Sequence, residues 1–191
     1  MSRNARDTGD MSPVSLAVLG FDEVPLHWPW GEGPSSFRSP TVDGRLLQEV
    51  LTPLYATRHS DQLDIAYPLT SLFEPAEQVT WLTSLMGGQS LTALEPGRTA
   101  IAYCSQCFSD TDGWVLACRI RATDATVTWD HFGIDNDSDN FGRYGKPGRV
   151  TPPPSGWFEE CFSGDSSIVF DRSLYENAVA AEISRLEGAT P

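Results

Sequence analysis

The amino-acid sequence predicts an α+β fold in which helices pack on one face of a mainly antiparallel sheet of five or six strands. Three observations lead to this class. Short stretches that alternate apolar and polar residues follow one another between residues 99 and 132. Residues 44–58 and 173–186 instead repeat apolar residues at helical spacing. A strongly curled sheet with the C-terminal helix across its open side is the alternative arrangement.

Length and composition predict one domain preceded by a short tail. The chain has 191 residues, of which 40% are hydrophobic, and this suffices for a core without disulfides or metals. Residues 1–12 are polar and small without periodicity, so we expect a flexible tail there. We expect residues 13–191 to form a single α+β domain, because the sequence has no internal repeat and no second apolar core.

The first half of the chain alternates between strands and helices. Four elements are expected there: strands at residues 14–19 and 63–69, a helix at 44–58 and a shorter helix at 77–86. Pro53 should end or kink the first helix, because proline cannot continue the helical hydrogen bonds. Gly87 and Gly88 should stop the second helix.

The second half begins with three strands, which we expect at residues 99–104, 113–121 and 125–132. A tight turn at residues 122–124 joins the last two and makes them antiparallel. Leu116, Cys118 and Ile120 alternate with their neighbours along the middle strand, so we expect them to face the core.

A Gly-, Asp- and Pro-rich connection at residues 135–154 leads into two short strands, at 156–162 and 167–170, and a final helix at 173–186. Asp171 or Ser173 can cap this helix, and Glu176 stands three residues after Ser173, as in a capping box. Its apolar side is expected to consist of Leu174, Ala178, Ala181, Ile183 and Leu186.

The excess of acidic over basic residues limits the kinds of molecule that the protein is expected to bind. The chain has 13 Lys+Arg against 26 Asp+Glu, a formal net charge of -13. This charge disfavours nucleic acid and anionic membrane surfaces, which are bound through clustered basic residues. It would favour encounter with a basic protein, although high charge also serves solubility alone. No secretory signal and no membrane span is visible, so we expect a cytoplasmic protein with reduced thiols.

Cys104 and Cys107 form a Cys-x-x-Cys motif, a spacing that can hold a metal or act as a redox dithiol. Three interpretations stay open: two packing thiols, a metal site and a redox site. A redox motif should open a helix, but the residues after Phe108 are typical of a turn. The sequence therefore favours packing thiols and predicts no cofactor.

Two further groups could bind a ligand. Asp135, Asp137 and Asp139 start like a calcium-binding loop, but Asn140 and Lys146 replace the glycine and glutamate that an EF-hand requires, so a solvated acidic loop is the simpler interpretation. Trp28 and Trp30 lie in a segment rich in proline and glycine. They could stack on sugar or peptide groups, or cover an edge of the core.

Catalytic motifs are absent from the sequence. It contains no G-x-S-x-G, G-x-x-x-x-G-K-[ST], G-x-G-x-x-G or H-E-x-x-H. Asp130 precedes His131, but consecutive residues of a regular strand point to opposite faces, so we expect no pairing between these two side chains. No catalytic residue is predicted.

Residues 99–186 resemble a group of uncharacterised small bacterial proteins. The shared pieces are a cysteine-containing strand at Tyr103-Cys-Ser-Gln-Cys, a V-x-W-x-x-F strand at residues 127–132 and an F-D-R-x-x-Y-E helix start at residues 170–176. The resemblance implies a common scaffold and carries no established catalytic residues. In it, Trp129 and Phe132 would anchor the core, and Tyr175 would pack the helix onto the sheet.

These observations favour a non-enzymatic module that binds another protein. An immunity-type inhibitor that covers a basic partner is one concrete form, because acidic surfaces complement basic ones. The alternative is a thiol-dependent oxidoreductase or metal-binding protein that uses Cys104 and Cys107.

Overall fold

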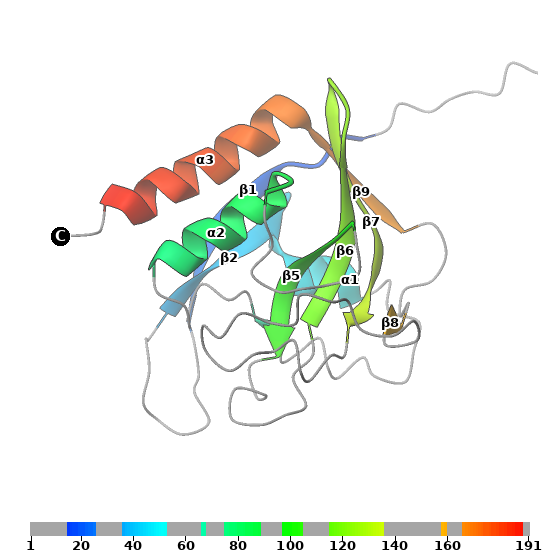
Figure 1. Ribbon diagram of the computed structural model, residues 1–191, viewed down its shortest axis with the longest axis horizontal. Helices are drawn as coiled ribbons and strands as arrows, with labels where there is room; N and C mark the ends of the chain where they lie inside the picture. Colours follow the sequence, from blue (N-terminus) through cyan, green and yellow to red (C-terminus); the bar gives the residue numbers. More distant parts are fainter. Residues whose placement is uncertain are drawn as a thin grey trace, which may run out of the picture.

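A computed structural model describes residues 15–25, 36–52, 66–67, 75–88, 97–104, 115–135, 158–159 and 166–188. This part of the chain forms two antiparallel sheets and three helices, so the predicted α+β class is confirmed (Figure 1). The predicted central sheet is present, and a second, smaller sheet accompanies it.

The larger sheet has six strands: β4 (Ala66–Tyr67), β5 (Arg98–Cys104), β6 (Val115–Ala122), β7 (Thr126–Asp135), β8 (Phe158–Glu159) and β9 (Ser167–Asp171). Strand β7 pairs along one edge with β6. Its other edge is shared, because β9 pairs with its first half and β8 with its end. All these pairings are antiparallel, as the alternation in the sequence predicts.

The smaller sheet corrects one sequence prediction. It consists of β1 (Leu19–Pro25), β2 (Ser36–Val42) and β3 (Arg45–Leu46), followed by the short helix α1 (Leu47–Leu51). Asp43 and Gly44 have φ angles of 54° and 72°. Two consecutive positive φ angles are typical of a type I′ hairpin turn, which favours Asp-Gly. The helix predicted from residue 44 was therefore wrong at its start, and residues 53–58 lie outside the described part.

The start of the chain's described part joins the two sheets. The strand predicted at 14–19 is displaced, since β1 begins at Leu19 and only Ala17 before it forms a bridge, to Phe170 of β9. The Ala17 N–H donates to the Val169 carbonyl at 2.7 Å. Val18 exchanges hydrogen bonds with Asp43 in the hairpin turn. The small sheet is thus tied to the outer edge of β9.

Helices α2 (Pro75–Leu85) and α3 (Arg172–Gly188) lie side by side and cover the sheets (Figure 1). Helix α2 ends as predicted: Gly87 has a φ of 85°, and the Gly88 N–H donates to the Thr83 carbonyl at 3.0 Å. At the start of α3 the Leu174 N–H donates to Oδ1 of Asp171 at 3.0 Å, so Asp171 is the cap.

Two details of α3 differ from expectation. Glu176 pairs with Arg172 at 2.7 Å rather than forming a capping box with Ser173. The buried side of the helix consists of Tyr175, Val179, Glu182 and Leu186. Leu174, which was expected on the apolar side, is 54% exposed.

An aromatic cluster of Trp129, Phe170 and Tyr175 connects α3 to the larger sheet, and all three side chains are buried. The Trp129 Nε1–H donates to the Tyr175 hydroxyl at 3.1 Å, and this hydroxyl donates to the Leu85 carbonyl of α2 at 2.8 Å. Burial raises the pKa of the Tyr175 hydroxyl. Phe132 is also buried, so the predicted roles of Trp129, Phe132 and Tyr175 in the core are confirmed.

Candidate functional site

Most of the residues predicted to form a site lie outside the described part of the chain. These are Trp28, Trp30, Cys107, Asp137 and Asp139. Cys104 is the last residue of β5, where its backbone is in register with Ala66, and Asp135 is the last residue of β7, in register with Phe158. A thiol site at Cys104 and Cys107, and a ligand site at Trp28, Trp30 or the Asp135–Asp139 loop, therefore stay predictions.

Cys118 is a packing thiol. It lies in β6 and is fully buried, as the alternation predicts. Burial raises its pKa well above the ordinary value, and the nearby Asp130 carboxylate adds to this, while Arg98 acts in the opposite direction. Because the thiolate is the reactive form, a thiol with this environment is chemically inert in the folded protein.

Asp130 and His131 form a pair, contrary to the expectation from regular strand alternation. Asp130 is 5% exposed. Its carboxylate forms an ion pair with Arg121 and lies 2.8 Å from His131 Nδ1. The expectation was wrong because the strand is irregular here: His131 has a φ of 51°, and the register with β6 shifts between Ala117 and Arg119. Regular alternation of faces does not apply across such a bulge.

The geometry at His131 orients its ring. His131 Nδ1 faces Oδ1 of Asp130, and because a carboxylate oxygen accepts, Nδ1 is the donor to it and Nε2 is directed away from the pair. The ring is 48% exposed, and Arg98 Nη1 donates to the His131 carbonyl at 3.2 Å. In the described ranges no group of three or more His, Cys, Asp or Glu residues could hold a metal ion. The contacts shown hold the bulge in place.

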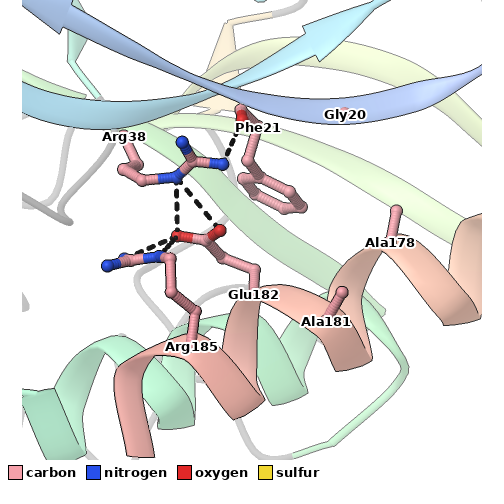
Figure 2. A pocket seen from close by; sticks show the side chains of 7 residues that line it. All are labelled: Gly20, Phe21, Arg38, Ala178, Ala181, Glu182 and Arg185. Atoms are coloured by element: carbon pink, nitrogen blue, oxygen red, sulfur yellow. Dashed lines mark hydrogen bonds and ion pairs between the residues drawn. The ribbon is translucent and has the colours of Figure 1, made fainter. Parts of the chain in front are cut away.

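A pocket of about 320 Å³ lies between α3 and β1 (Figure 2). Its lining residues are Gly20, Phe21, Arg38, Ala178, Ala181, Glu182 and Arg185. Small residues on both elements leave this space open. Gly20 cannot carry a side chain without displacing Thr41, because an added Cβ would lie 2.8 Å from Thr41 Oγ1.

One end of the pocket is strongly polar. Glu182 is 4% exposed and lies between two guanidinium groups (Figure 2). Arg38 Nε is 3.1 Å from each Glu182 carboxylate oxygen. Arg185 donates to Oε1 through Nη2 at 2.7 Å and Nε at 3.0 Å. The Arg38 guanidinium also donates to the Phe21 carbonyl, which ties β2 to β1 beside the helix.

This cluster is not recognisable from the sequence. Arg38 and Glu182 are 144 positions apart, so no local pattern connects them. One signal was available: Glu182 follows Tyr175 and Val179 at helical spacing and precedes Leu186, so a carboxylate lies within the buried side of the helix. A buried carboxylate requires a hydrogen-bonded or charged partner. The tertiary structure is needed to show that Arg38 and Arg185 are the partners of this one.

No family model, no curated protein and no solved structure matches this chain. None of the helices in the described residues is long and apolar enough to cross a membrane.

Proposed function

We propose that this protein is a non-enzymatic cytoplasmic module that binds another protein through an acidic surface, and that the partner's contact surface is basic. An immunity-type inhibitor is the concrete form of this proposal. The observation that carries it is the distribution of charge: the net charge is -13, and the described arginines are largely engaged within the protein.

The arginines are used to hold the fold. Four of them pair with carboxylates: Arg38 and Arg185 with Glu182, Arg121 with Asp130, and Arg172 with Glu176. Two others donate to backbone carbonyls, Arg45 to Glu49 and Arg98 to His131. Arg119, by contrast, is exposed on β6. Six of the seven arginines in the described part of the chain are therefore engaged in contacts within the protein, and four of these contacts are with carboxylates.

Several carboxylates remain directed to solvent. Asp22 on β1, Glu49 on α1 and Glu187 on α3 are exposed and form no ion pair within the described residues. Exposed carboxylates on a protein of high negative charge speed encounter with a basic partner and disfavour binding to acidic ones. It would suit a module that covers the nucleic-acid-binding face of a basic toxin, because that face is itself rich in Lys and Arg.

Affinity capture with the full-length chain tests the proposal. The chain is immobilised and exposed to lysate of the organism that encodes it, at about 0.05 M and about 0.5 M salt, because surface electrostatics weaken as the Debye length falls. The proposal expects one stoichiometric basic protein that is retained better at low salt. A triple variant, Asp22→Asn, Glu49→Gln and Glu187→Gln, should retain it less well.

A matched control keeps the charge unchanged. Asn177→Ala with Ser184→Ala alters two exposed positions of α3 and should capture the partner as the unmodified chain does. Absence of any stoichiometric partner would contradict the proposal. So would a neutral or acidic partner whose retention does not respond to salt.

A further inference from the structure

The pocket between α3 and β1 contains an apolar slot that ends at one buried carboxylate. The walls of the slot are the Phe21 ring and the small residues Gly20, Ala178 and Ala181. Figure 2 shows Ala178 and Ala181 along α3, with the Phe21 ring facing them from β1. Glu182, which follows Ala181 on the helix, lines the same pocket and is 4% exposed.

The two carboxylate oxygens of Glu182 differ in the number of hydrogen bonds that they accept. Oε1 accepts from Arg38 Nε at 3.1 Å and from Nη2 and Nε of Arg185 at 2.7 and 3.0 Å. Oε2 is 3.1 Å from the same Arg38 Nε, and no other hydrogen bond reaches it from the described residues. A carboxylate oxygen has two lone pairs, so Oε2 can accept a further hydrogen bond.

The oxygen with this spare capacity lies on the side of the slot. In Figure 2, Oε2 is the carboxylate oxygen nearer to Phe21 and Ala181, whereas Arg185 approaches Oε1 from the opposite side. A buried acceptor is stabilised by a donor that reaches it, because burying a polar group without its hydrogen bonds is costly. The ligand group that matches the end of the slot is therefore a hydrogen-bond donor.

The charges around Glu182 determine which kind of donor fits. Arg38 and Arg185 carry two positive charges against the one negative charge of Glu182, a sum of +1. A cationic donor would lie close to two guanidinium groups, and an anionic group would have no proton to donate to Oε2. A hydroxyl group donates a hydrogen bond without adding charge, and its bond to an ionised acceptor is stronger than one between neutral groups.

Size and lining restrict the rest of the ligand. The volume of about 320 Å³ is at the lower end of the range usual for small-molecule pockets, roughly 300–1,000 Å³. The slot offers an aromatic ring and methyl groups, which favour an apolar body.

We propose that this pocket binds a small uncharged alcohol or phenol with an apolar body. The hydroxyl group donates to Glu182 Oε2, and the body lies between Phe21 and Ala181. This site is separate from the acidic surface of the proposed function, since none of its lining residues is among the three exposed carboxylates of that surface.

Nuclear magnetic resonance titration of the full-length protein tests this assignment. The probes are benzyl alcohol and phenol. Anisole has the same ring without a hydroxyl donor, and benzylamine and benzoate carry a positive and a negative charge. The expected result is saturable shifts of the Gly20, Ala181 and Glu182 amides with both hydroxyl probes. The other three compounds should bind at least about tenfold more weakly, which is about 1.4 kcal/mol, because a hydrogen bond to a charged group contributes at least that much.

A pair of leucine substitutions on α3 tests the position of the ligand. Ala181→Leu fills the slot and should weaken the binding of benzyl alcohol at least about tenfold. Ala180→Leu is the matched control, because this neighbouring residue is exposed and does not line the pocket, and it should leave binding unchanged. Native-like spectra of the free variants establish that each one is folded.

Four results would overturn the assignment: no saturable shifts with either hydroxyl probe, shifts that map away from the pocket, anisole or a charged probe that binds as tightly as benzyl alcohol, or unchanged affinity in Ala181→Leu. None of these would bear on partner capture through Asp22, Glu49 and Glu187, so the two proposals fail independently.

Discussion

The Tyr175 hydroxyl offers a direct test of how α3 is held in place. It accepts from Trp129 Nε1 at 3.1 Å and donates to the Leu85 carbonyl at 2.8 Å, so one oxygen connects α3, β7 and the end of α2. Tyr175→Phe removes that oxygen but keeps the ring, which is 1% exposed and packed against Trp129 and Phe170. The aromatic packing should survive, and only the two hydrogen bonds should be lost.

The expected loss of stability in Tyr175→Phe follows from the two hydrogen bonds that are removed and from the buried partner groups that remain. Each hydrogen bond contributes about 1 kcal/mol, and leaving a buried donor or acceptor without its partner costs about 1–3 kcal/mol. Trp129 is fully buried, so water cannot replace the hydroxyl at its Nε1–H. We expect a loss of about 2–3 kcal/mol in the free energy of unfolding. For a chain of 191 residues this corresponds to a fall of about 4–12 °C in Tm.

Urea unfolding followed by tryptophan fluorescence measures this loss. The midpoint should fall while the m-value stays constant, because the surface exposed on unfolding is the same. Leu174→Ala is the control on the same helix: that side chain is 54% exposed, so its change should stay within about 0.5 kcal/mol. If Tyr175→Phe also lies within about 0.5 kcal/mol of the unmodified protein, the hydroxyl does not join the three elements.

Three further predictions concern the buried carboxylate, the buried thiol and the hairpin turn. Glu182→Gln should lower the free energy of unfolding by roughly 2–4 kcal/mol in urea, because it leaves two arginines without their carboxylate; Glu176→Gln, in an exposed pair, should change it by less than about 0.5 kcal/mol. Cys118 should resist a thiol reagent in the native protein and react once denaturant is added; labelling without denaturant would contradict its burial. The pKa of the Cys118 thiol is raised in the folded state, so the unfolded chain loses this proton first as pH rises above about 8.5. The free energy of unfolding should therefore be unaffected by this thiol below about pH 8.5 and fall above it, by up to about 1.4 kcal/mol per pH unit. Cys118→Ala should flatten that slope. Gly44→Ala should cost about 1 kcal/mol by thermal unfolding, since φ is 72° there; an unchanged Tm would rule out the left-handed turn.

Local patterns predicted much of the second half of the fold. The alternation of apolar and polar residues predicted β5, β6 and β7, and the helical spacing of apolar residues predicted α3. These predictions succeed because the period of a regular element determines which of its side chains can be buried together in the core. The Asp43-Gly44 hairpin was also locally encoded. It was missed because Leu46, Leu47, Val50 and Leu51 recur at helical spacing, and that pattern is satisfied only by the short α1 that follows the turn.

Tertiary structure alone decided the two polar clusters. Asp130 and His131 pair because β7 bulges against β6, and this irregularity depends on how the two strands pair and not on the residues of β7 alone. The pocket exists because α3 packs across β1 and brings Glu182 to Arg38, 144 positions away. By itself the sequence determined composition, charge and the period of its regular elements. The packing of helices against sheets decided which distant side chains contact one another. The hydrophobic effect is non-directional, so the sequence pattern alone does not tell which distant residues will pair.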